Sequence, residues 1–236
     1  SNNFNYSLKA GWMYTLPHTT FNVDLEGGYG GRTRTGDLDY TEERVVGSQP
    51  FANGDYYSRD DYDLHETYFQ GSVGFDHKFN DEGHQLTGSF YLKYGGNAME
   101  YFQSDLFNKK NEREQGHRAW EDEHRWTVRG NMDYIYPYSK TGHIEAGYQY
   151  FSYLEDGDYS MQFWSPEKQE FYWRDDIYNT FYFQHGINSI YAIVGDSYKS
   201  FDFQAGVRGE HTHRVLRSSI PGKDCEYNKF EFFHSV

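Results

Sequence analysis

The amino-acid sequence predicts an all-β fold, an antiparallel up-and-down meander of about nine strands. Three observations carry this prediction. Apolar and polar residues alternate with period two in eight segments, which is typical of strands that have different surroundings on their two faces. Short and long connections between these segments alternate along the chain, and no connection shows a helical apolar period of useful length. The same arrangement of turn, strand, long loop and strand is therefore predicted to repeat along the chain.

Each predicted strand is defined by its own alternation. In the eighth segment, for example, Phe201, Phe203 and Val207 alternate with the polar or charged residues between them. The eight segments are residues 6–14, 21–29, 69–76, 86–94, 126–134, 144–150, 180–194 and 201–210, and a ninth begins near Tyr227.

The connections indicate what surrounds the strands. The short ones are residues 16–20, 79–84, 136–142 and 195–200, and the long ones are about 31–64, 95–122, 155–178 and 213–226. Short turns at one end and long loops at the other are typical of a transmembrane β-barrel, with periplasmic turns and extracellular loops. This predicts lipid against the apolar face and a wet lumen against the polar face.

Composition excludes several classes of protein. With 36 acidic and 22 basic residues and a net charge of -14, the chain has no basic surface for nucleic acid. The longest apolar run, 190–194, is far shorter than the roughly 20 residues of a membrane helix. The mean hydropathy of -0.96 does not argue against a barrel, whose strands give a weak hydropathy signal. The single cysteine, Cys225, excludes a disulfide framework, and we expect no cofactor and no signal peptide in residues 1–236.

Two other folds fit parts of the pattern. A soluble β-sheet carbohydrate-binding module would pack the apolar face on a protein core, and a small complete barrel with an adhesive or protease-like role would need an even number of strands. Aromatic residues favour the membrane. A barrel has girdles of Tyr and Trp at both ends of its strands, and such residues occur near the short turns and near the long loops: Trp12, Tyr14, Tyr134 and Tyr136, then Tyr29, Tyr94 and Tyr150.

Candidate sites are few, and none is catalytic. Rings with nearby carboxylates suit a sugar or another amphipathic ligand, although the same rings could pack on one another. The candidate ligand-binding aromatics are Phe163, Trp164, Phe171, Tyr172 and Trp173. The charges expected in the lumen are Arg129, Asp133, Glu145, Arg208 and Glu210. A metal site is not expected, because His211 and His213 do not converge with Glu210 and the acidic loops lack an EF-hand spacing.

Four segments also resemble, in order, a known family. AGVRGEHT (205–212) looks like the "aGLRxExT" strand of the TonB-dependent-receptor-like outer-membrane barrels common in Bacteroidetes, and MDYIYPYSKTGHIEAGYQY (132–150) is similar to their "DYxxPxxxxxxxEaGxk" hairpin. INSIYAIV (187–194) resembles their "IxAaYa" strand, and FFHSV (232–236) their "lFPSv" turn, with His234 in place of Pro.

The resemblance implies a non-enzymatic outer-membrane receptor that imports a nutrient. Its partners would be outer-membrane lipid, an unknown solute (a glycan, siderophore or peptide) and the TonB system, reached through missing parts of the parent protein. The chain has no recognisable plug domain and an odd apparent strand number. We therefore expect residues 1–236 to be a single segment of a larger barrel, with two edge strands that need further partners.

Overall fold

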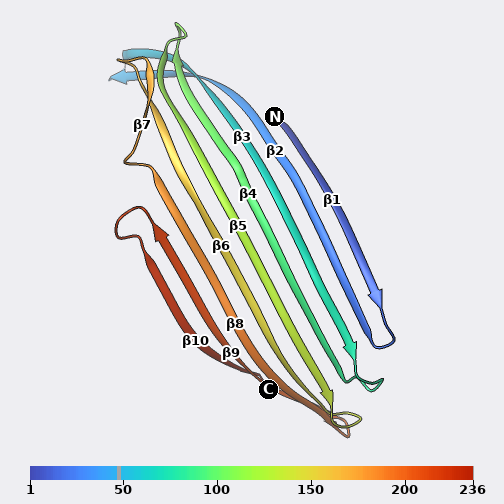
Figure 1. Cartoon of the computed structure of the whole chain (residues 1–236). Helices are drawn as coiled ribbons and strands as arrows, with labels where there is room; N and C mark the ends of the chain where they lie inside the picture. Colours follow the sequence, from blue (N-terminus) through green and yellow to red (C-terminus); the bar gives the residue numbers. More distant parts are fainter. Residues whose placement is uncertain (47–48, 236) are drawn as a thin grey trace.

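The computed structural model describes residues 1–46 and 49–235, which form one antiparallel sheet of ten strands. Nine strands follow one another across the sheet in chain order, and the short β7 pairs only with β6 (Figure 1). The strands are β1 (Asn2–Thr15), β2 (Thr19–Val46), β3 (Gln49–Lys78), β4 (Gln85–Asn108), β5 (Arg113–Pro137), β6 (His143–Ser165), β7 (Glu170–Trp173), β8 (Asn179–Tyr198), β9 (Phe201–Ser218) and β10 (Cys225–Ser235). The predicted meander of about nine strands is confirmed. No helix of the described residues is long and apolar enough to cross a membrane.

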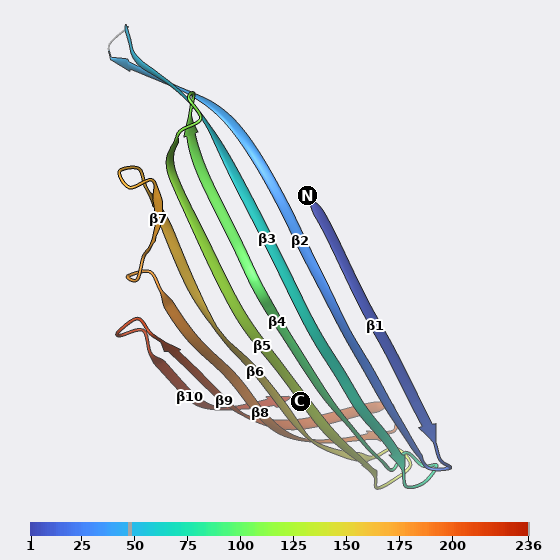
Figure 2. The ribbon, with the colours of Figure 1, turned by 45° about the horizontal axis from the view of Figure 1, so that its top comes forward.

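The predicted long loops are wrong in one respect, because most of their residues continue the strands. The second hairpin keeps its pairing as far as Val46 and Gln49, and β4 pairs with β5 as far as Phe107 (Figure 2). Beyond the apolar segments both faces carry polar side chains, so the alternation by which strands are recognised disappears while the backbone ladder continues. In these parts of the strands, polar cross-strand pairs take the place of the apolar side chains. One such pair is Thr35 with Asp61, whose hydroxyl and carboxylate oxygens are 2.8 Å apart.

The predicted apolar face is one continuous surface of the sheet. Cross-strand partners share a face, and the register lines up one such row across all nine strands. It runs through Tyr14, Phe21, Phe75, Gly88, Met132, Tyr148, Ile190, Gly209 and Phe232. No second sheet covers this surface among the described residues, and their only buried hydrophobic side chain is Ala119. The described residues therefore lack the protein core against the apolar face that the soluble module needed.

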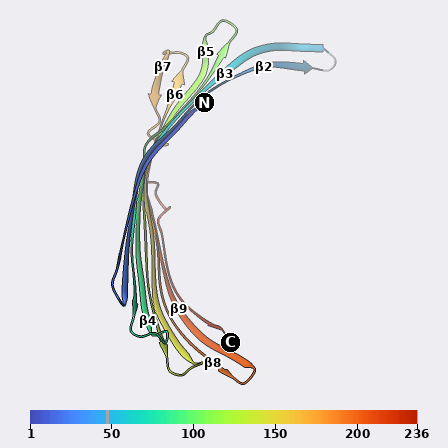
Figure 3. The ribbon, with the colours of Figure 1, turned by 90° about the vertical axis from the view of Figure 1, so that its right-hand side faces the viewer.

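The two faces differ in how closely their side chains approach one another. Ile190 on the apolar face is 67% exposed, whereas its neighbour Ser189 on the polar face is 2% exposed. Side chains spread apart on the convex side of a curved sheet and crowd together on its concave side. The apolar face is therefore convex. Figure 3 shows the sheet edge-on as an arc, with the far end of the β2–β3 hairpin bent toward the concave side.

The apolar band crosses the rows of paired residues obliquely. The band is the part of the convex face covered by the alternating apolar residues, and its lower end is the end nearer the short turns. On β1 it covers residues 6–14, with Tyr14 at its lower end. On β9 it covers residues 201–209, with Gly209 at its upper end. Because Tyr14 and Gly209 share a row, the band shifts by about one residue per strand, which corresponds to a strand tilt of roughly 40°. Strands of closed barrels have this tilt.

The tilt also explains the predicted aromatic girdles. Tyr29, Tyr94 and Tyr150 lie on the convex face on successively lower rows, as a level line across tilted strands requires. At the opposite end, Trp12 stacks on Tyr14 with ring centroids 5.6 Å apart. Both sets therefore mark the edges of one band.

Candidate functional site

The concave face carries a network of hydrogen-bonded polar side chains with Arg208 at its centre. Its Nε donates to Glu210 Oε1 at 2.6 Å, Nη1 to Gln149 Oε1 at 2.9 Å and Nη2 to Ser189 Oγ at 2.9 Å. These partners lie on β6, β8 and β9, so one guanidinium fork links three strands. Charge-assisted bonds of this kind hold a side chain in one orientation.

A second part of the network depends on a glycine. The hydroxyl of Tyr191 on β8 reaches across β6 and donates to Asp133 Oδ1 on β5 at 2.5 Å. Gly147 lies between them in the same row, and a Cβ there would be 2.4 Å from the tyrosine ring. Asn131 Nδ2 donates to the other Asp133 oxygen at 2.9 Å, so this carboxylate is held from two sides.

The structure places all five charges predicted for the lumen on this concave face. Arg208 and Glu210 form the centre of the network, and Asp133 forms the second part. Arg129 lies over the rings of Tyr91 and Phe151, and Glu145 lies 3.4 Å from His143 Nε2. They therefore share a face without forming one cluster.

Sequence reasoning missed the uncharged members of the network. Ser189, Gln149 and Gly147 carry no charge, and Tyr191 looked like one more aromatic residue of a strand. A signal was present, because each lies on the polar face of its strand. Once the register is known, Gly147, Ser189 and Tyr191 face the charged residues Asp133, Glu210 and Arg208, and Gln149 faces Ser189.

The five predicted ligand-binding aromatics do not form one surface. Trp164 and Phe171 pair on the convex side and, with Phe107, surround the guanidinium of Arg113 at 4.8–5.4 Å. Arg113 in turn donates to Asp105, which is 2% exposed. These two rings therefore pack between hairpins, the other outcome that the sequence left open.

The remaining three divide between the two sides. Phe163 and Tyr172 pair with each other on the concave face, where His117 lies 6.2 Å from the Phe163 ring. Trp173 pairs with Gln162 on the convex face. Phe163 and Tyr172 are the two that face the same side as the charges.

Ion pairs hold the hairpins outside the apolar band. A hydrogen bond from Lys109 lowers the pKa of Asp55, with a smaller contribution from Thr41. Arg174 donates to Asp176 from Nε at 2.7 Å, and this hydrogen bond lowers the pKa of the carboxyl. In each pair one partner is exposed and the other is half-exposed, so each pair stabilises the hairpins only slightly.

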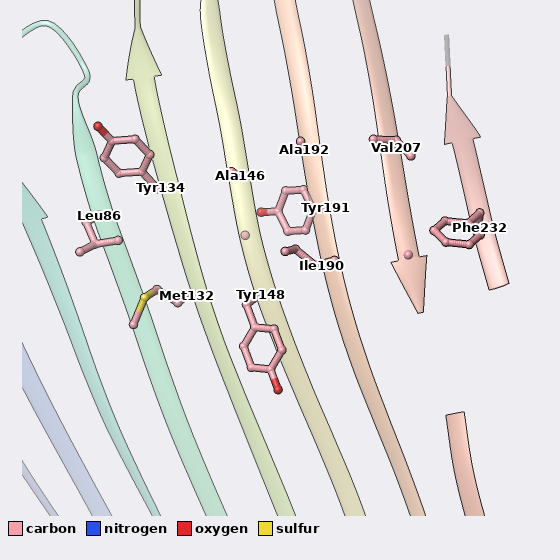
Figure 4. A pocket seen from close by; sticks show the side chains of 12 residues that line it. Leu86, Met132, Tyr134, Ala146, Tyr148, Ile190, Tyr191, Ala192, Val207 and Phe232 are labelled. Atoms are coloured by element: carbon pink, nitrogen blue, oxygen red, sulfur yellow. The ribbon is translucent and has the colours of Figure 1, made fainter. Parts of the chain in front are cut away.

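The convex face has a hollow of about 570 Å³ (Figure 4). Small residues, Ala146, Ala192 and Gly209, form its floor, and the larger side chains of Met132 and Ile190 border it. Because the lining is apolar and the hollow opens on the apolar band, it is suited to hydrocarbon rather than to a polar solute.

Together these features define a class of protein. A tilted antiparallel wall with an exposed apolar convex face, aromatic edges and a polar concave face is the wall of a transmembrane β-barrel. The described part of the wall is open, because β1 pairs only with β2 and β10 only with β9.

Comparison with known proteins gives the family. The model of the "Outer membrane protein beta-barrel family" matches residues 77–236, and the chain belongs to this family. The chain is thus part of an outer-membrane barrel, with its short turns periplasmic and its long hairpins extracellular. No curated protein matches the chain.

The comparison with solved structures gives matches of low identity, two of which are a transporter and a receptor. The unliganded ferric citrate transporter FecA is 12% identical, with a TM-score of 0.44, and the match covers 98% of this chain and 38% of that one. BauA, the ferric preacinetobactin receptor of Acinetobacter baumannii, is 7% identical, with a TM-score of 0.44 and coverage of 98% and 42%. The chain therefore spans less than half the length of either.

Proposed function

We propose that this chain is the barrel wall of a TonB-dependent-type receptor that takes up a nutrient and catalyses no reaction. The observation that carries the proposal is the concave network, in which Arg208, Glu210 and Asp133 are held in fixed orientations on the face opposite the lipid. A wall needs only an apolar outer face to be stable in a membrane. An ordered set of charges on the inner face is expected where solute or a plugging segment passes.

The extracellular hairpins would supply the first contact with the solute. Phe163 and Tyr172 face the concave side, and Arg174 lies 5.0 Å from the Phe163 ring. Rings beside a cation suit an amphipathic solute, whether glycan, siderophore or peptide. The plug and the segment that contacts TonB would belong to the rest of the parent protein, and the resemblance to receptors of Bacteroidetes remains a prediction.

The experiment is a comparison of uptake in cells that carry the wild-type gene, a deletion, or the double variant Phe163→Ala/Tyr172→Ala. We expect the deletion to abolish uptake of one class of solute and the double variant to weaken binding of that solute to the purified full-length protein at least tenfold. Trp164→Phe, which changes a ring of the convex side, is the matched control and should leave binding unchanged. Uptake of all three classes by the deletion strain at wild-type rates would contradict the proposal.

A further inference from the structure

A row of aromatic rings lies on the convex face well above the apolar band. Trp120 on β5 is 5.5 Å from Tyr101 on β4 and 5.1 Å from Trp173 on β7, measured between ring centroids. Trp173 is 55% exposed. The three rings, named here the outer aromatic row, face away from the lumen and so cannot meet a solute inside the barrel.

The position of this row on β5 separates it from the hydrocarbon. Trp126 lies at the upper edge of the band, and the next outward-facing residues, His124 and Asp122, are polar. The rings then return at Trp120, six residues beyond Trp126. At the rise and tilt of these strands, that is roughly 15 Å further from the membrane centre. Contact with acyl chains therefore does not account for the outer aromatic row.

Polar groups lie beside the rings at the same level. Arg118 Nε donates to Gln103 Oε1 at 3.1 Å, and the Tyr101 hydroxyl donates to the same oxygen. Gln103 Nε2 donates to Asp105 Oδ2 at 2.5 Å. Asp105 is buried, so its carboxylate orients the Gln103 amide and does not meet a ligand itself. Aromatic faces combined with amide and guanidinium groups are the chemistry that binds sugars, whose rings have apolar faces and hydroxyl edges.

We propose that the outer aromatic row binds the sugar headgroups of the glycolipid in the outer leaflet of the membrane. The row lies on the same face of the wall as the band that contacts lipid, and two of its three rings lie on strands of that band, β4 and β5. Its height, roughly 15 Å above the upper edge of the band, is beyond the roughly 5–8 Å of the polar headgroups, at the level of sugars that extend outward from them. The sugars would extend the lipid contact upward along the wall and hold the extracellular hairpins. The proposal depends on the membrane location of the chain and is independent of nutrient uptake.

Two adjacent residues make a matched pair for the test. Trp173 on the convex face is 55% exposed, and Tyr172 on the concave face is 44% exposed. Neither side chain is buried, so replacement by Ala should leave the folded hairpin intact, which a heat-modifiability gel would verify.

The full-length protein in lipid nanodiscs is titrated with lipopolysaccharide that has its core sugars and with the same glycolipid stripped to its acylated diglucosamine. We expect the wild type to bind the sugar-bearing form about tenfold more tightly. Trp173→Ala should remove this preference, and Tyr172→Ala should retain it.

Equal binding of both glycolipids by the wild type, or equal effects of the two variants, would overturn the proposal. Co-purification of a protein seated on the row, in place of glycolipid, would overturn it as well. Solute uptake should be unchanged in Trp173→Ala, so failure here is distinguishable from failure of the proposed function.

Discussion

The two faces of the sheet are built from neighbouring residues of the same strands, yet they are stabilised differently. The convex face has exposed apolar side chains, such as Ile190, that gain stability only from lipid. The concave face has hydrogen-bonded groups, such as Ser189 and Arg208, that hold one another. The convex face therefore tolerates any apolar side chain that lipid can cover, whereas the concave face depends on particular residues that hydrogen-bond to one another.

The largest expected effect comes from placing a charge on the convex face. Met132 lies near the middle of the band on β5, and Met132→Arg should cost about 2–4 kcal/mol of folding stability in a bilayer. Guanidinium unfolding of the full-length protein from liposomes measures this cost. Thr127→Arg, on the concave face of the same strand, is the control. Equal losses in both variants would mean that the two faces do not differ in their surroundings.

A loss of about 2 kcal/mol is expected from Arg208→Ala on the concave face. The substitution removes three hydrogen bonds and leaves Glu210, Gln149 and Ser189 without that partner. Arg208→Lys should restore only part of the stability, because a single ammonium cannot reproduce the guanidinium fork. If Arg208→Ala unfolds at the wild-type guanidinium concentration, the network does not stabilise the wall.

A smaller loss, about 1–2 kcal/mol, is expected for Gly147→Val. The added side chain would overlap the Tyr191 ring and separate its hydroxyl from Asp133. Gly130→Val is the control, because a Cβ there meets only the Ser89 carbonyl oxygen at 3.8 Å. The free energies of unfolding of the two variants are compared. A larger loss in Gly147→Val than in Gly130→Val would show that Tyr191 needs a glycine at position 147 to reach Asp133, and equal losses would contradict this.

The smallest effect is expected from acidification of the extracellular hairpins. Because the pKa of Asp176 is lowered in the folded protein, its pair with Arg174 stabilises the hairpin fully above pH 3.8. That contribution is lost as the pH falls through the lowered pKa. Proteolysis of the β7–β8 connection in intact cells should therefore change little between pH 7 and pH 5. A marked increase in cleavage within that range would contradict this assignment.

The sequence predicted more of the convex face than of the concave face. Lipid selects only for apolar character, and this appears directly as the period-two pattern of segments such as 201–210. The contacts of Arg208 with Gln149 and Ser189 join residues of three strands and depend on a register that no local pattern contains.

The extracellular hairpins show a different reason for failure. Trp164 and Phe171 have the composition of a ligand site but pack around Arg113, and the choice between these roles depends on which strand lies beside them. The predicted loops, similarly, are strands whose two faces both meet water. Their backbone ladders leave no signature in the order of apolar and polar residues.

The central claim, that lipid covers the convex face and water the concave face, can be tested directly by site-directed spin labelling along β5. Cys225→Ser removes the cysteine of residues 1–236, and any cysteine in the rest of the full-length protein is replaced as well. Single cysteines at positions 126 to 134 then carry a nitroxide in the full-length protein reconstituted in bilayers. The collision rate with oxygen, which dissolves in lipid, should peak at positions 126, 128, 130, 132 and 134, and the collision rate with a water-soluble nickel complex at the positions between them. Collision rates without this alternation, or with the two reagents exchanged, would contradict the account.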